Sequence, residues 1–160
     1  MAKTRAIQAL DQARVAYTLH TYDYDPDAER IGVQAAEGLG VPVAQVFKTL
    51  MMTVDGRAVC VLAPSDREVS LKKVAAAHGG RSAQMMRPAD AERVTGYHVG
   101  GISPFGQKRR APALIDASAL EHETIFINGG QRGLQVRLRP QEAADALGAV
   151  LVEVVAAEVS

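Results

Sequence analysis

Apolar and polar positions alternate along the chain with two different periods, and the changes of period divide it into elements. Apolar residues recur at helical spacing in some stretches, and these predict helices at residues 4–14, 33–39, 71–78, 88–94 and 140–147. Other stretches alternate every second residue or form short apolar runs, and these predict strands at residues 15–22, 48–54, 57–63, 113–116, 124–128, 134–139 and 150–155. In the first strand, His20 and Tyr22 share a face because successive side chains point to opposite sides.

Local signals mark where several of these elements begin, end or turn. Thr4 and Ser70 stand where helix N-caps are expected, and Gly40 stands where a helix ends. Asp55-Gly56 separates two strand-like runs, a pairing that suits a type I′ turn and predicts a hairpin. Strands joined by a hairpin thus occur beside strands separated by helices. This mixture predicts an α/β (mixed α+β) fold, with helices packed on a mixed sheet rather than on a doubly wound parallel sheet.

Length and composition indicate a single domain, 1–160. The 160 residues are 48% hydrophobic and 22% charged, which is ordinary for a soluble domain. Lys and Arg (18) balance Asp and Glu (18), which argues against nonspecific coating of nucleic acid but allows a local basic patch. With no signal peptide and no apolar stretch of about 20 residues, we expect no membrane association and a cytoplasmic location. The lone Cys60 lies in an apolar run, which predicts a buried core thiol and suits a reducing cytosol.

A glycine-rich basic loop, GGISPFGQKRR at residues 100–110, attracts attention as an anion site. It has the glycine spacing of a phosphate-binding P-loop, but Gln107 stands where the lysine belongs. It also begins like a Gly-x-Ser-x-Gly nucleophile elbow around Ser103, but Phe105 replaces the last glycine. The glycines still allow a ligand to approach the backbone, and they precede three cations suited to phosphates: Lys108, Arg109 and Arg110. A solvated turn with ordinary surface charge is the alternative interpretation.

Metal motifs are missing from the sequence, whereas one lysine stands out. The histidines lack the spacing of metal ligands, and they are His20, His78, His98 and His122. We therefore expect no metal and no other cofactor. Lys48 shares a strand face with Leu50 and Met52, so its ammonium emerges at the edge of an apolar surface. It is either a lysine whose stem covers apolar surface or a cation at the mouth of a pocket.

Three separated motifs, QVFKTLMM, TGYHVGGISPFGQKRRAPALID and INGGQRGLQVRL, resemble those of the YbaK family of aminoacyl-tRNA deacylases. This family is similar to the editing domain inserted in bacterial prolyl-tRNA synthetases. The resemblance implies a mixed, barrel-like sheet with a pocket for the aminoacylated 3′ CCA end of a tRNA. The loop sequence favours the branch that clears Cys-tRNA(Pro) in trans, with Cys-tRNA(Cys) as a further substrate. The family also suggests a ternary complex with prolyl-tRNA synthetase.

The same resemblance assigns roles to particular residues. Lys48 matches the family's essential lysine, and backbone N–H groups near Gly101 would stabilise an oxyanion, which makes these two the catalytic candidates. The residues that would form the aminoacyl pocket are His20, Tyr22, Ile31, Gly100, Ile102, Ser103, Pro104 and Gln135. The cations Lys108, Arg109 and Arg110 would contact phosphates of the single-stranded CCA end.

The mechanism implied by the family needs no protein nucleophile. The thiol of the mischarged cysteine attacks its own ester carbonyl and releases a cyclic thiolactone and free tRNA, so the enzyme supplies geometry. Ile31 and Gln135 stand where some relatives carry an aromatic residue and an aspartate, and either change could alter the amino acid accepted. Three alternatives stay open: a deacylase that removes another small residue, such as alanine from Ala-tRNA(Pro), with water; a noncatalytic tRNA or nucleotide binder; and a regulatory partner of a synthetase.

Overall fold

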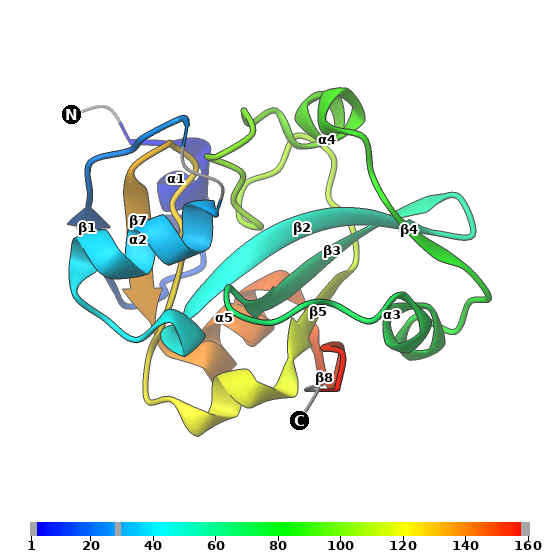
Figure 1. Ribbon diagram of the computed structural model, residues 1–160. Helices are drawn as coiled ribbons and strands as arrows, with labels where there is room; N and C mark the ends of the chain where they lie inside the picture. The colour runs from blue at the N-terminus through cyan, green and yellow to red at the C-terminus, as the bar shows by residue number, and fades with distance from the viewer. Residues whose placement is uncertain (1–2, 28–29, 158–160) are drawn as a thin grey trace.

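The computed structural model describes residues 3–27 and 30–157 (Figure 1). Its helices are α1 (Arg5–Gln12), α2 (Ile31–Leu39), α3 (Leu71–Ala77), α4 (Pro88–Thr95) and α5 (Pro140–Leu147), with short 3-10 helices η1 (Val43–Gln45) and η2 (Ala117–Glu121). Its strands are β1 (Tyr17–Thr21), β2 (Val46–Val54), β3 (Arg57–Pro64), β4 (Ala83–Met85), β5 (Ala113–Asp116), β6 (Ile125–Asn128), β7 (Leu134–Leu138) and β8 (Val150–Val152). Every helix and strand expected from the sequence is present, with small shifts at the ends. The short β4 was not expected, because three residues are too few to show a period.

The local signals for caps and turns are confirmed. The side chain of Thr4 accepts a hydrogen bond from the N–H of Ile7 at 3.1 Å, and Ser70 caps α3 in the same way. Gly40 ends α2 in the left-handed conformation, with φ +69°. Asp55 and Gly56 both have positive φ, +50° and +81°, as a type I′ turn requires. These local choices therefore agree with the fold that the whole chain adopts.

The strands form one mixed sheet in the order β1-β7-β6-β2-β3-β5-β8, with β4 paired to β2. The pairs β2–β6, β3–β5 and β5–β8 are parallel, and β1–β7, β6–β7, β2–β3 and β2–β4 are antiparallel. This sheet with packed helices confirms the expected fold class. One sheet thus connects the first strand with the last, and the single domain, 1–160, stays a prediction.

The long strand β2 changes partners along its length. On the side opposite β3, its first residues Val46 and Phe47 pair with β6, whereas residues 52–54 pair with β4. Within the described part of the chain, residues 48–51 have no registered strand partner on that side. The middle of β2 therefore borders a gap in the sheet. Lys48, the lysine that the sequence singled out, lies in this part of the strand.

Helices cover the two ends of the β2–β3 hairpin. In Figure 1 the hairpin crosses the molecule, with α1 and α2 beside one end and α3 and α4 nearer its turn. One core cluster joins Leu10 of α1 to Phe47 of β2 and Ile127 of β6, and another joins Val74 of α3 to Met52 of β2. Among the described residues, none of the helices has the length and apolar character needed to cross a membrane.

Candidate functional site

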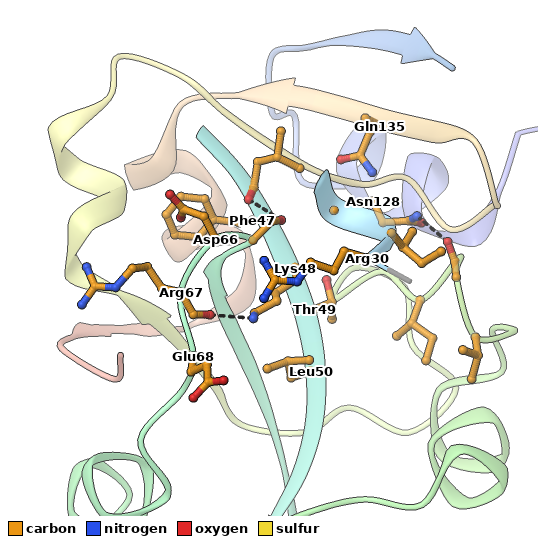
Figure 2. A pocket seen from close by; sticks show the side chains of 17 residues that line it. Arg30, Phe47, Lys48, Thr49, Leu50, Asp66, Arg67, Glu68, Asn128 and Gln135 are labelled. Atoms are coloured by element: carbon orange, nitrogen blue, oxygen red, sulfur yellow. Dashed lines mark hydrogen bonds between the residues drawn. The ribbon is translucent and has the colours of Figure 1, made fainter. Parts of the chain in front are cut away.

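A cavity of about 460 Å³ lies beside the middle of β2, which has no registered strand partner on the side opposite β3 (Figure 2). Its walls come from the N-terminus of α2, from β2, from the segment that follows β3, from the loop at residues 99–102 and from the ends of β6 and β7. Segments far apart in the sequence therefore meet at this point. The volume lies within the range of pockets that bind small molecules or a terminal group of a larger ligand.

Lys48 is the central cation of the cavity. Its side chain is half-buried, and its Nζ donates a hydrogen bond of 2.6 Å to the carbonyl oxygen of Arg67 (Figure 2). Burial lowers the pKa of Lys48, the positive charge of Arg30 lowers it further, and the carboxylates of Glu68 and Asp66 oppose the shift. The structure thus places a restrained, partly desolvated ammonium group among the lining residues.

Two polar atoms without protein partners belong to residues of the cavity wall. Among the buried side chains described, the unpartnered atoms are the Tyr22 hydroxyl, Gln34 Oε1, Thr49 Oγ1 and Gln135 Oε1. Thr49 and Gln135 both line the cavity. Leaving a buried polar atom unsatisfied costs about 1 to 3 kcal/mol. A ligand that offered hydrogen bonds to these two atoms would recover part of that cost.

Tyr22 is buried and is not among the residues that line the cavity. Burial raises the pKa of Tyr22, and the neighbouring Gln135 side chain opposes this rise without meeting the geometry of a hydrogen bond. Tyr22 packs in a cluster with Phe126, and the ring of His20 meets the same Phe126 edge-on at 5.3 Å. His20 also shares a hydrogen bond of 2.8 Å with Thr18. Neither His20 nor Tyr22 lines the cavity, so their expected direct contact with a ligand gains no support.

The glycine-rich loop reaches the cavity through Gly100 and Ile102, both of which line it, as does Ile31 of α2. Gly101 is buried, and its N–H donates to the carbonyl oxygen of His98 at 2.8 Å. The Gly101 N–H is therefore already used within a turn, and an oxyanion donor among the backbone N–H groups near Gly101 stays a prediction. A Cβ on Gly101 would lie 2.8 Å from the backbone nitrogen of Arg132, so this glycine allows two loops to pack closely.

Two other loop residues expected in the pocket wall lie in the protein interior. Ser103 is fully buried, and its Oγ accepts a hydrogen bond from the N–H of Phe105 at 3.2 Å. Pro104 is buried and lines a separate, smaller cavity near α1 and α5. Neither residue lines the large cavity, so the structure gives no support to their direct contact with substrate, which stays a prediction.

The basic end of the loop does not reach the large cavity. Lys108, Arg109 and Arg110 are exposed. The backbone of Lys108 and Arg109 is bonded to the C-terminal end of α4, and the Arg110 guanidinium donates to the carbonyl oxygen of Leu147 at the end of α5. Their expected contact with phosphates of the 3′ end stays a prediction that the cavity lining does not support. The cations that do line the cavity are Arg30, Lys48 and Arg67.

Sequence reasoning missed several residues of the cavity wall. Asn128 joins two loops, since its Nδ2 donates to the Gly100 carbonyl oxygen at 3.2 Å and its Oδ1 accepts from the N–H of Gly130 at 2.7 Å (Figure 2). An asparagine before Gly-Gly is typical of such a turn and was a usable signal. Arg30 and Arg67 lie in segments without a motif, so only the fold brings them to Lys48.

Comparison with known proteins identifies the class to which this fold and cavity belong. Residues 25–146 match the aminoacyl-tRNA editing domain, and the chain belongs to that family. The match includes every segment that lines the cavity. The resemblance noted in the three sequence motifs is thereby confirmed.

Individual relatives narrow the comparison. The chain is 35% identical over 144 residues to a protein of Enterococcus faecalis named "Putative Cys-tRNA(Pro)/Cys-tRNA(Cys) deacylase EbsC", which covers 87% of this chain and 85% of that protein. It is 36% identical over 91 residues to a proline–tRNA ligase of Acidithiobacillus ferrooxidans, covering 57% of this chain and 16% of the ligase. The solved structure of a "putative trans-editing enzyme for prolyl tRNA synthetase" shares the fold, with a TM-score of 0.81 and 23% identity over 96% of each chain.

Proposed function

We propose that this protein is a deacylase that clears Cys-tRNA(Pro) in trans, and Cys-tRNA(Cys) with it. The observation that carries the proposal is the cavity itself, which is lined by the half-buried Lys48 and by Thr49 and Gln135, whose side-chain oxygens have no hydrogen-bond partner. A cation and hydrogen-bonding side chains in one cavity suit a ligand in which an ester and other polar atoms lie close to a phosphate. Family membership and the similarity to a protein named for this activity support the same substrate class.

The cavity wall supports a mechanism in which the substrate supplies the nucleophile. Of the described residues that line it, none is a cysteine or histidine, and the Ser65 hydroxyl already donates to the Val46 carbonyl oxygen at 2.7 Å. The thiolate of the bound cysteine attacks its own carbonyl carbon, the bond from that carbon to the ribose oxygen breaks, and a thiolactone forms. The thiol proton passes through solvent to the leaving ribose oxygen. Well-oriented intramolecular attack can lower the barrier by about 7 to 11 kcal/mol.

The protein residues then hold the ester and balance its charge. The Lys48 ammonium orients the terminal nucleotide or the ester through charge-assisted hydrogen bonds. The backbone N–H groups of Gly100 and Ile102, which line the cavity, replace Gly101 as candidates for the oxyanion donors. Removing one such donor costs about 2.7 to 4 kcal/mol of transition-state stabilisation in enzymes where it has been measured.

Partner and location follow from the same proposal. A free-standing deacylase must meet its substrate soon after the synthetase releases it, so we include a ternary complex with tRNA and prolyl-tRNA synthetase in the proposal. We likewise propose that it acts in the cytoplasm, where charged tRNA is used.

Deacylation assays test this function directly. Purified protein is incubated with Cys-tRNA(Pro), Cys-tRNA(Cys), Ala-tRNA(Pro) and Pro-tRNA(Pro), and we expect loss of the two cysteinyl esters only. Lys48→Ala should lose at least about 100-fold in rate, since it removes a charged partner worth some 2.7 kcal/mol or more. The matched control is Lys72→Ala, an exposed lysine on α3 that should keep full activity. If none of the four esters disappears faster than in buffer, the protein is not a deacylase; cleavage of Ala-tRNA(Pro) alone would indicate the water-dependent alternative.

A second assay tests the nucleophile. Alkylating the substrate thiol should abolish turnover because the attacking atom is blocked. Cys60→Ala should leave turnover unchanged, since Cys60 is buried and burial raises the pKa of its thiol to about 12. Loss of activity in a folded Cys60→Ala protein would overturn substrate-assisted cleavage.

A further inference from the structure

An arginine–tyrosine pair stands at the rim of the cavity. The guanidinium carbon of Arg132 lies 5.5 Å from the centroid of the Tyr24 ring, and Arg132 Nε donates to the Val99 carbonyl oxygen at 2.9 Å. Val99 itself lines the cavity and is exposed, as is Arg132. The pair therefore contacts the cavity wall at Val99 and is itself accessible to solvent.

Two close backbone approaches hold the pair against the cavity loop. A Cβ on Gly100, where φ is +91°, would lie 2.5 Å from the Tyr24 hydroxyl, and a Cβ on Gly101 would lie 2.8 Å from the Arg132 nitrogen. Neither position has room for a side chain without movement of its neighbour. The glycines thus press the loop against both members of the pair, and Asn128 ties the same loop to the turn that carries Arg132. A rim built in this way is fixed in position before a ligand arrives.

The charges around the pair decide which part of a nucleic acid fits it. Asp23 and Asp25 flank Tyr24 in the chain, and the pKa of Glu92 is lowered chiefly by the hydrogen bond from the Val99 N–H and to a smaller extent by the positive charge of Arg132, so Glu92 lies in the same region. Local carboxylates offset the attraction of Arg132 for a phosphate. A neutral base with a large π face meets no such penalty, and aromatic rings and guanidinium planes are the usual stacking partners of unpaired bases.

We propose that the Tyr24–Arg132 pair stacks the 3′-terminal base of a single-stranded tRNA end while the ester enters the cavity beside Lys48. The inference rests on the proposed function for the identity of the strand. It gives the phosphates no role at this pair.

Binding to an uncleavable probe tests the stack. The probe is a 5′-fluorescein-labelled RNA strand that ends in CCA and carries cysteine through an amide; a second probe has an abasic terminal ribose. For the wild-type protein, removal of the base should weaken binding roughly 5- to 150-fold, the equivalent of about 1 to 3 kcal/mol for one stacked base. Tyr24→Leu should bind both probes with the same weak affinity. Tyr24→Phe, the matched control, should behave as wild type because it keeps the ring.

The decisive quantity is the difference between wild type and variant in the loss of affinity that removal of the base causes. Arg132→Lys keeps the charge and loses the plane, so it should weaken base-dependent binding without changing the salt slope. If base removal costs Tyr24→Leu as much as it costs wild type, the stack is refuted. That result with intact deacylation would leave the proposed function standing, whereas coupling without deacylation would support the stack and refute the enzyme. Melting curves of each variant verify that it is folded.

Discussion

Lys48 shows how one residue acquires its character from the fold. A gap in the strand pairing of β2 leaves it beside a cavity, the Arg67 carbonyl oxygen restrains its ammonium, and burial with Arg30 lowers its pKa. The sequence predicted a lysine at the edge of an apolar surface, and it could not choose between a stem covering that surface and a cation at a pocket. The choice depended on Arg30, Arg67 and Asp66, which no motif connects to Lys48.

The lowered pKa gives a prediction about pH. A cation whose pKa is depressed loses its charge as pH rises, at a value below the ordinary lysine pKa of about 10.4. The rate should therefore rise as the substrate thiol ionises and then fall on an alkaline limb set by Lys48. Lys48→Arg, which keeps its charge at all accessible pH values, should lack that limb if positive charge is what the site needs. Values of kcat/KM between about pH 7 and pH 10, corrected for spontaneous ester loss, measure the limb. The same limb in Lys48→Arg would assign it to another group.

At the scale of elements, the sequence predicted local features such as caps and turns more completely than it predicted which strands pair. The Asp55-Gly56 turn, the Thr4 cap and the αL end at Gly40 depend on neighbouring residues, so the sequence contains them in full. The three-residue β4 and the change of partner along β2 depend on contacts across the sheet, and no window of sequence reports them. The composition of the glycine-rich loop drew attention to it, but its cations and Ser103 do not line the large cavity.

The close packing of this loop can be tested at Gly101. Gly101→Ala should lower kcat/KM at least about tenfold and the free energy of unfolding by about 1 to 3 kcal/mol, because the new methyl group must displace the turn at Arg132. Gly56→Ala is the matched control. The positive φ of Gly56 strains an alanine, but a Cβ at this position would meet no atom within 4 Å. Gly56 is not among the residues that line the cavity. We expect Gly56→Ala to lower the free energy of unfolding by a similar amount and to leave kcat/KM unchanged. Equal activities in the two variants would show that the loop packing does not shape the site.

At the scale of the whole molecule, two groups of basic side chains lie in different regions. Formal charge cancels over the chain, yet Arg30, Lys48 and Arg67 gather at the cavity while a second basic group at residues 108–110 lies between the ends of α4 and α5. The sequence showed only the second group, because its members are consecutive. A tRNA is long enough to contact both regions, so the exposed group remains a candidate for contacts beyond the CCA end.

This separation predicts two different salt dependences. Replacing Lys108, Arg109 and Arg110 by glutamine should reduce the slope of log K against log salt by about 0.9 for each lost contact to duplex tRNA. Binding of a short CCA strand should not change, since these side chains do not line the cavity. Fluorescence titrations of both RNAs over a range of salt measure the two slopes. A changed slope for the short strand would return these cations to the 3′ end, and unchanged slopes for both would make them ordinary surface charge.

The unpartnered oxygens of Thr49 and Gln135 also connect occupancy with the lifetime of the protein. A ligand that hydrogen-bonds to these oxygens binds only the folded chain. It therefore lowers the amount of unfolded protein on which proteases and chaperones act. At a ligand concentration about 100 times Kd, the folded form gains about 2.7 kcal/mol, which lowers the unfolded fraction about 100-fold. A cell that mischarges more tRNA would therefore degrade this protein more slowly, and the error itself would raise the capacity to correct it.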